Sequence, residues 1–432
     1  MRKRGYIILG LICFLIGLTY LSCEKKYDST VKDRYASTNE AVNDEEIGGD
    51  EEYYAGKNDE KASHEQASST DADDKEKRPD AGSRTSVTIR NIPSTELIKE
   101  FSIGWNLGNT LDATGGGALP NTEMSWGNPY TRKEVFDKVK EAGFNIVRIP
   151  VSWGNHLGPE PDYEIHKVWL DRVNEVVDYA IDNGLYVILN MHHEEWHFPS
   201  YENFEKANAI LTSVWAQIAE RFKDYDEHLI FEGMNEPRMK GTPYEWTGGN
   251  AEARDVINKL NRSFVETVRS AGGNNPWRHL MIPPYAASSD PKTWKDFLIP
   301  EDDKIIVSIH AYTPYNFALN KKGTSEWSSE KTSDTAEIDK LMDNIYNSFI
   351  SKGYAVIIGE FGAMDKDNLK DRVDWAGYYV KKASEKGIPC LWWDNGAFVG
   401  DGELFGLLDR RNFTWKYPEI VEALTDGISK QD

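Results

Sequence analysis

Short apolar runs recur along the chain from about residue 86 onward, and polar stretches separate them. Each run is rich in Val, Ile, Leu and Phe, and the step between runs is about 40 residues, the length of a strand followed by a helix. We predict that these runs are the eight strands of one sheet, at residues 103–106, 145–150, 186–193, 229–236, 279–283, 305–310, 355–360 and 389–393.

Amphipathic stretches with a helical period fill the intervals between the runs. They cover residues 133–142, 168–183, 204–222, 251–271, 335–351 and 371–386, with a short and weaker stretch near 291–297. Glycine, a common residue just past a helix end, follows several of them, at Gly143, Gly184, Gly353 and Gly387. Alternating strands and helices favour a parallel sheet, and eight such units predict an α/β fold, a closed (β/α)8 TIM barrel over residues 86–430.

The first 85 residues lack this pattern. Basic residues at positions 2–4 precede an uncharged, mostly apolar stretch, so residues 1–23 are typical of an export signal. The end of this stretch resembles a bacterial lipoprotein signal, in which Cys23 would carry a lipid anchor; a plain cleaved signal and an uncleaved single-helix anchor are the alternatives. Residues 24–85 are charged and polar and cannot bury enough apolar surface to offset ordering, so we predict a disordered linker whose role the sequence leaves open.

Composition narrows the range of partners. Acidic residues outnumber basic ones by 71 to 50, and a net charge of −21 argues against nucleic acid and anionic membranes but not against a neutral polymer such as a glucan. The 14 tryptophans suit either stacking on sugar rings or a large apolar core. Cys13 and Cys23 lie in the leader, so Cys390 is alone in the predicted barrel and no internal disulfide is expected there.

Polar or aromatic side chains stand at the carboxyl ends of most of the predicted strands. In a barrel these ends meet at one face, where active sites form. The sequence therefore predicts a site at that face from Arg148, His192, His193, Asn235, Glu236, His310, Tyr312, Glu360 and Trp393.

Two carboxylates in this set suggest the chemistry. An isolated glutamate is more often a surface or ion-pairing residue, but Glu236 and Glu360 end the fourth and seventh predicted strands and would face each other across the barrel mouth. Glycoside hydrolysis with retention needs a pair of carboxyl groups about 5–5.5 Å apart. We expect that spacing, with Glu236 held neutral by a raised pKa and Glu360 ionised as the nucleophile.

The neighbouring residues fit those roles. We expect Arg148 and the Tyr312 hydroxyl to keep Glu360 ionised and Asn235 to hold the sugar 2-hydroxyl. His310 would orient Glu236 or relay its proton, and Trp393 would form the floor beneath the reacting ring.

A metal site and a nucleotide site are the competing hypotheses. The stretch from His192 to His197 is rich in histidine and glutamate, but neighbours on a strand point to opposite faces, so His192 and His193 are not expected to chelate one ion. The HExxH spacing of zinc helices is absent. The glycines at 115–117 lack a strand-to-helix context and a following lysine, so we predict no metal and no cofactor.

Several short motifs carry a resemblance to a known family. From about residue 94 to 424 the chain resembles glycoside hydrolase family 5, the cellulase family A. The resemblance implies that Glu236 is the proton donor and Glu360 the nucleophile, with supporting roles for Arg148, His192, Asn235, His310, Tyr312 and Trp393. The matching motifs are GWNLGNT at 104–110, VRIPVSW at 147–153, HHE at 192–194, FEGMNEP at 231–237, HAY at 310–312, IGEFG at 358–362 and WWDNG at 392–396.

The motifs are similar to those of bacterial endoglucanases, lichenases and xyloglucanases. The resemblance implies a retaining endo-β-1,4-glucanase, or cellulase, that acts on β-glucan. From the leader we expect it to be secreted or anchored at the bacterial cell surface. We expect a monomer, but the sequence does not determine the oligomeric state. A xyloglucanase or a mixed-linkage β-glucanase is the first alternative, a mannanase is further behind, and a non-catalytic glycan-binding surface protein is the remote one. The sequence leaves polymer preference and product length open.

Loop tryptophans are the candidates for further sugar contacts. Trp126, Trp196, Trp246 and Trp327 lie in predicted loops, where each either stacks on a glucose unit or packs in its loop. No carbohydrate-binding module is visible after the barrel, so we expect soluble or amorphous glucans as substrates.

Overall fold

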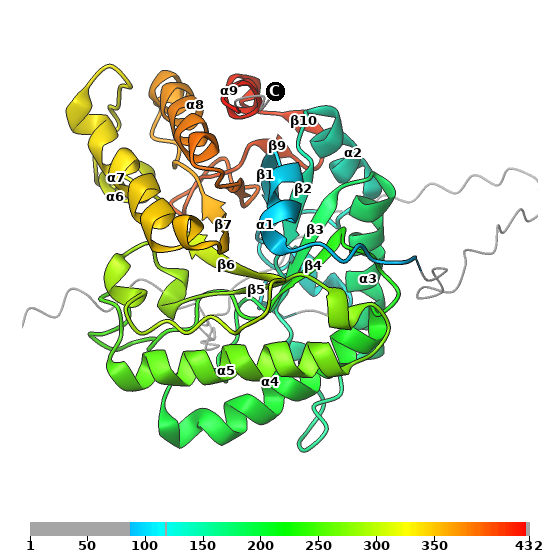
Figure 1. The fold of residues 1–432 in the computed structure, drawn as a ribbon. Helices are drawn as coiled ribbons and strands as arrows, with labels where there is room; N and C mark the ends of the chain where they lie inside the picture. The colour runs from blue at the N-terminus through cyan, green and yellow to red at the C-terminus, as the bar shows by residue number, and fades with distance from the viewer. Residues whose placement is uncertain (1–86, 117–118, 429–432) are drawn as a thin grey trace, which may run out of the picture. The chain divides into compact units, whose positions relative to one another are not determined.

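A computed structural model of the chain describes residues 87–116 and 119–428, so the predicted export signal and linker lie outside the described residues. Eight parallel strands close into a barrel in chain order, with β8 paired to β1, and Figure 1 shows the helices around it. The predicted TIM barrel is confirmed. The strands are β1 Ile103–Leu107, β2 Ile146–Ile149, β3 Tyr186–Asn190, β4 Leu229–Glu232, β5 Leu280–Ile282, β6 Ile305–His310, β7 Ala355–Phe361 and β8 Cys390–Asp394, and outside the barrel β9 Leu408–Asp409 pairs with β10 Thr414–Trp415.

The main helices other than α9, which has no predicted counterpart, follow the predicted stretches to within a few residues. They are α2 Lys133–Glu141, α3 Lys167–Asp182, α4 Tyr201–Arg221, α5 Ala251–Ser270, α7 Thr332–Ser348, α8 Leu369–Glu385 and α9 Pro418–Asp426. The short elements are α1 Ser94–Leu97, η1 Ile98–Glu100, η2 Asn121–Met124, η3 Gly154–His156, η4 Asn275–Trp277, η5 Tyr285–Ala287, η6 Pro291–Thr293, α6 Tyr315–Ala318 and η7 Ile350–Lys352. The weak stretch near 291–297 forms only the 3-10 turn η6, which Asp290 caps through the backbone N–H of Lys292. None of the helices in 87–116 and 119–428 has the length and apolar character needed to cross a bilayer.

The apolar core has two main parts, beside a small cluster of Met364, Trp393 and Phe405. One lies between the strands and the surrounding helices, where Trp215 of α4 contacts Phe231 of β4 and Phe264 of α5. The other is a separate cluster that joins strand side chains to the segment before β1, where α1 and η1 lie. Its members are Leu97, Ile98, Phe101, Ile146, Tyr186, Ile188, Ile230, Met281, Ile306, Ala355, Ile357 and Leu391. This packing closes the N-terminal end of the barrel, so the polar site is left to the carboxyl end.

Two strands end earlier than the sequence predicts. β3 stops at Asn190 and β4 at Glu232, so His192, His193 and Glu236 lie in the loops just after the strands. The two loops are tied together, because the backbone N–H of Asn235 donates to the carbonyl oxygen of Met191 at 2.8 Å. The site residues that follow β3 and β4 therefore lie on loop segments that are hydrogen-bonded to each other, and not on the strands of the sheet.

Candidate active site

Glu236 and Glu360 meet at the carboxyl end of the barrel. One carboxylate oxygen of each and one ring nitrogen of His310 all lie within 4.8 Å of one another. The side chain of Glu360 is 7% exposed and that of Glu236 is 17% exposed, so both remain open to a narrow approach. This closeness fits the separation of about 5–5.5 Å used for direct attack and not the 6.5–9.5 Å that leaves room for an attacking water.

Two donors hold the carboxylate of Glu360. Nη1 of Arg148 donates to Oε1 at 2.6 Å, and the hydroxyl of Tyr312 donates to Oε2 at 2.9 Å. Burial, together with the nearby charge of Glu360, raises the pKa of Tyr312 well above its usual value. Tyr312 therefore stays a neutral donor, and Arg148 and Tyr312 are the two partners that the sequence analysis expected beside the carboxylate of Glu360.

Arg148 itself is clamped by residues that the sequence analysis did not assign to the site. Its Nε donates to Oε2 of Glu232 at 2.6 Å, and its Nη1 also contacts Oδ1 of Asn106 at 3.2 Å. Arg148 and Glu232 are both fully buried, and Ser308 donates to the second oxygen of Glu232 at 2.7 Å. The sequence did contain a signal for this contact, because Glu232 interrupts an apolar strand and a buried charge needs a partner.

Glu236 shares a hydrogen bond with His310. Nδ1 of His310 lies 2.8 Å from Oε1 of Glu236 and 3.6 Å from Oε2 of Glu360. Burial raises the pKa of Glu236, but the hydrogen bond and the positive charge of His310 outweigh burial and lower it to about 2. Burial lowers the pKa of His310, but the charge of Glu360 and the bond to Glu236 outweigh burial and raise it above 6.5.

These opposite shifts favour the proton on His310 rather than on Glu236 in the unliganded protein. We expected Glu236 to carry it, with a raised pKa, and the structure differs because two acidic groups face one imidazole. The proton has only a 2.8 Å hydrogen bond to cross before it reaches Glu236. Glu236 and His310 together hold one proton, and as one unit they can still act as the acid.

The remaining predicted residues line the same opening. Asn235 turns Oδ1 toward Nη2 of Arg148 at 2.7 Å, so its amide nitrogen is the end that can donate to a sugar hydroxyl. The rings of His192 and Trp393 lie nearly parallel, with centroids 5.7 Å apart. Asn190 contacts Nδ1 of His192 at 3.0 Å and fixes that ring. Trp393 is 7% exposed, enough to offer part of one face.

His193 and His192 are closer in space than the sequence argument allowed. Because both follow the end of β3, they do not point to opposite faces of a strand, and their ring centroids are 4.4 Å apart. A ring nitrogen of each and an oxygen of Asp112 all lie within 4.8 Å of one another. That geometric argument against chelation was therefore wrong. Burial raises the pKa of Asp112 to about 7, and its two oxygens already accept the backbone N–H groups of Asn109 and Thr110.

The four candidate tryptophans separate by exposure. Trp246 is 65% exposed and Trp126 is 41% exposed, and Trp126 lies 5.4 Å from the ring of His193. Trp196 is partly buried and donates to Oε2 of Glu194 at 2.7 Å. Trp327 is only 3% exposed, and its indole N–H donates to the carbonyl oxygen of Asp334 in the first turn of α7. A sugar ring has no access to Trp327, so the predicted subsite role is not kept for it.

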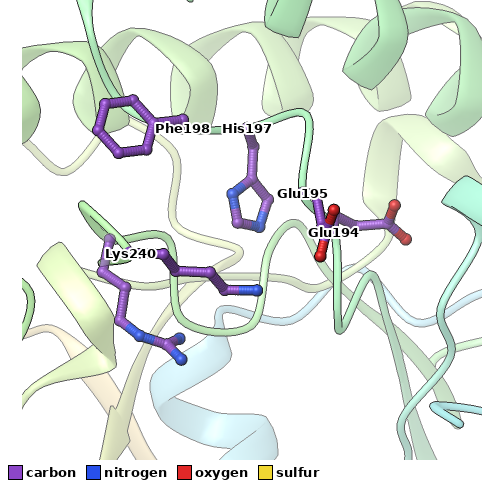
Figure 2. Close-up of a pocket in the computed structure, with 6 residues that line it drawn as sticks. Glu194, Glu195, His197, Phe198 and Lys240 are labelled. Carbon is purple, nitrogen blue, oxygen red and sulfur yellow. The ribbon is translucent and has the colours of Figure 1, made fainter. Parts of the chain in front are cut away.

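A small cavity of about 190 Å³ opens beside the site, between the loops after β3 and β4. Figure 2 shows His197 and Lys240 directed into this space, with Phe198 at one side and the two glutamates at the other. Nε2 of His197 has no hydrogen-bond partner among the described residues. The cavity is lined by Glu194, Glu195, His197, Phe198, Arg238 and Lys240.

Comparison with known proteins adds a family to this geometry. The family model described as cellulase (glycosyl hydrolase family 5) matches residues 111–399. Endoglucanase B of Neocallimastix patriciarum is 50% identical over 350 residues, which are 79% of this chain and 73% of that protein. The cellulase/esterase CelE of Acetivibrio thermocellus is 51% identical over 342 residues, which are 78% of this chain and only 41% of that longer protein.

Solved structures agree with the sequence matches. A GH5-4 broad specificity endoglucanase from Ruminococcus champanellensis, with bound cellotriose, is 52% identical and aligns with a TM-score of 0.76 over 78% of this chain and 100% of that chain. XEG5A, a xyloglucan-specific endo-β-1,4-glucanase from a metagenomic library in complex with cellotriose, is 47% identical, with a TM-score of 0.74 over 77% of this chain and 98% of that chain.

Proposed function

The chain belongs to glycosyl hydrolase family 5 and is an endo-β-1,4-glucanase, and from this premise we propose that it works by double displacement between Glu360 and Glu236. The observation that carries the proposal is the closeness of the two carboxylates: one oxygen of each lies within 4.8 Å of the other and of a ring nitrogen of His310. Substrate access supports it as well, since neither carboxylate is sealed in the core.

In the first step, an oxygen of Glu360 attacks the anomeric carbon while the bond to the glycosidic oxygen breaks. The proton held between His310 and Glu236 passes through Glu236 to the departing oxygen, so the cleaved chain leaves as a neutral alcohol. The product is a glycosyl ester on Glu360. Arg148 and Tyr312 hold Glu360 in place before the attack.

In the second step, Glu236 acts as a base. It removes a proton from a water molecule whose oxygen attacks the same carbon, and the ester bond to Glu360 breaks. The proton returns to the pair of Glu236 and His310, and Glu360 leaves as a carboxylate again. Two inversions at one carbon give net retention, and the amide nitrogen of Asn235 is placed to hold the 2-hydroxyl during both.

The substrate is a β-1,4-linked glucan. Structural neighbours with bound cellotriose support a β-glucan chain as the substrate. Relatives with about 50% sequence identity carry the name endoglucanase, which does not favour the xyloglucanase or mixed-linkage alternative. Exposed faces on Trp126 and Trp246, with the partly buried ring of Trp196, support stacking at subsites away from the cleaved bond. Activity on carboxymethylcellulose, lichenan, xyloglucan and mannan, measured side by side, tests this preference; mannan as the fastest substrate would contradict it.

We also propose that the enzyme works outside the cell. A glucan polymer is too large to enter, and the leader at residues 1–23 has the pattern of an export signal. The lipid anchor at Cys23 stays a prediction, because Cys23 lies outside the described residues. The monomeric state also stays a prediction.

Replacing each carboxylate tests the mechanism. We expect Glu360→Ala to lower kcat/KM by about 10⁴-fold or more on both polymer and aryl cellobiosides. Glu236→Ala should be nearly as damaging on polymer but far milder on a dinitrophenyl cellobioside, whose leaving group needs no proton. Azide should trap an α-glycosyl azide with Glu360→Ala and a β-glycosyl azide with Glu236→Ala.

Glu202→Ala, at an exposed glutamate of α4, is the matched control and should leave hydrolysis unchanged. Equal activity in the wild type and Glu360→Ala would overturn the assignment of the nucleophile. Polymer hydrolysis by Glu236→Ala at the wild-type rate would overturn that of the acid/base.

A further inference from the structure

Arg238, two residues after Glu236, is a cation that the proposed mechanism does not use. Its Nη1 donates to the backbone carbonyl oxygen of Glu236 at 3.0 Å and lies 3.3 Å from the carboxylate Oε2 of the same residue. His310 contacts the other oxygen, Oε1, at 2.8 Å. Each oxygen of Glu236 therefore has its own partner, and the plane of the carboxylate is fixed from two sides.

Arg238 is itself held from two further directions. Its Nε donates to Oε1 of Glu245 at 3.1 Å, and its guanidinium carbon lies 4.3 Å from the ring centroid of Trp246. The second oxygen of Glu245 accepts the backbone N–H of Gly241 at 2.9 Å, which ties the brace to the loop. The side chain of Arg238 is only 16% exposed, so its position is set by these contacts more than by solvent.

We propose that Arg238 is a positioning residue for Glu236, and that its charge limits how far up the pH scale the enzyme keeps its catalytic proton. This inference rests on the proposed role of Glu236 as acid/base. A cation at this distance favours the ionised form of Glu236 and so weakens the hold of the pair on its proton. The same cation assists the second step, in which Glu236 must be ionised to act as a base.

Other charged or titratable groups also act on Glu236, and the comparison must hold them constant. Burial raises the pKa of Glu236, the hydrogen bond and the charge of His310 lower it most, and the charge of Arg238 is the next cause that lowers it. The others are His310 on β6, Glu360 on β7, Tyr312 after β6, His193 after β3 and Glu403 after β8. Within residues 87–116 and 119–428, Arg238 forms no hydrogen bond or ion pair with Glu360 or Arg148, so replacing it leaves the nucleophile's own partners in place.

The test compares Arg238→Gln with Arg238→Lys through the pH dependence of kcat/KM. For Arg238→Gln we expect the alkaline limb to move up by about 0.5–1 pH unit, because one positive charge near the proton is lost. We expect kcat on soluble glucan to fall about 10–100-fold, and much less on dinitrophenyl cellobioside, since poor placement of the acid matters only when the leaving group needs a proton. Arg238→Lys should restore the alkaline limb without restoring kcat fully, because it returns the charge but not the forked geometry.

Glu245→Gln provides the opposite arm. Removing this carboxylate leaves the charge of Arg238 less neutralised, so the alkaline limb should move down rather than up. Arg132→Gln is the matched control: Arg132 also lies over an aromatic ring, 4.4 Å from the centroid of Phe413, and contacts Glu134 rather than Glu236. It should leave the limb unmoved.

One set of results would overturn the inference by showing a merely structural role. The alkaline limb would stay fixed in both Arg238→Gln and Glu245→Gln, activity would fall equally on polymer and aryl substrate, and the melting temperature would be lower. If Arg238→Gln does not fold, the kcat difference between Arg238→Lys and the wild type on the two substrates decides the positioning role, and Glu245→Gln decides the role of the charge. If the inference about Arg238 fails in this way, the activity lost in Glu236→Ala still supports the proposed function. Polymer hydrolysis by Glu236→Ala at the wild-type rate would instead contradict the proposed function itself.

Discussion

The two ends of the barrel are built from the same strands, but one end encloses apolar side chains and the other encloses charged ones. On β2, Ile146 belongs to the apolar cluster that closes the N-terminal end, and Arg148 lies in the site at the carboxyl end. On β4, Ile230 and Glu232 repeat that order. Because side chains two residues apart on a strand face the same side, one step of two residues takes the interior from an apolar core to a buried ion pair.

This contrast separates stability from chemistry along the barrel axis. Apolar burial at the closed end stabilises the fold by about 25 cal/mol for each square ångström removed from water. At the open end, buried charges cost desolvation free energy and are tolerated because each has a close partner. We therefore expect substitutions at the closed end to change unfolding and substitutions at the open end to change rates, with Arg148 as the residue that does both.

Arg148→Met should have the largest effect. It leaves Glu232 without its arginine and Glu360 without one of its two donors, so we expect kcat/KM to fall by at least about 10³-fold. Leaving the buried charge of Glu232 unpaired should also lower the free energy of unfolding by about 3–5 kcal/mol. Urea unfolding and glucan hydrolysis measure the two losses. Adding Glu232→Met should recover stability but not activity; recovery of both would break the comparison.

Ile230→Ala tests the closed end alone. It removes buried apolar volume from the cluster at the N-terminal end, and we expect the free energy of unfolding to fall by about 2–5 kcal/mol. Below the unfolding transition, kcat/KM should match the wild type, since Ile230 contacts no reacting group. A tenfold loss of activity in the folded variant would mean that the two ends are coupled.

His310→Gln sharpens the picture of the open end. In the wild type the pair of His310 and Glu236 keeps its proton to a pH above 6.5, because the neighbouring glutamates raise the pKa of His310. Without the imidazole, Glu236 must hold the proton alone, so the alkaline limb of kcat/KM should move down by about one pH unit. The kcat at the optimum should fall about 10–100-fold. An alkaline limb at the wild-type position would mean that His310 does not hold the proton.

Trp126→Ala should have the smallest effect. Its exposed ring near His193 is a candidate for stacking on a sugar, and losing about 1 kcal/mol of contact would raise KM about fivefold with little change in kcat. Trp327→Ala is the contrasting variant, because that ring is buried and should affect unfolding but not KM. A rise in KM for Trp327→Ala, or none for Trp126→Ala, would reverse our division of the tryptophans.

The sequence by itself determined the barrel and the two glutamates. Strand and helix periodicity is a local property, so eight alternating units were readable without coordinates, and the carboxyl end of a barrel strand is a known place for chemistry. The predicted strands extend past the ends of β3 and β4, because residues 191–193 and 233–236 are mostly buried but lie in loops and do not pair in the sheet.

Only the tertiary structure decided which side chains share a proton or a charge. Arg148 and Glu360 are 212 residues apart in sequence, and their contact exists because barrel closure brings β2 and β7 across one opening. The lowered pKa of Glu236, the brace on Arg238 and the burial of Trp327 likewise depend on neighbours that no local pattern reveals. Electrostatics and burial depend on distances through space, and periodicity reports only distances along the chain.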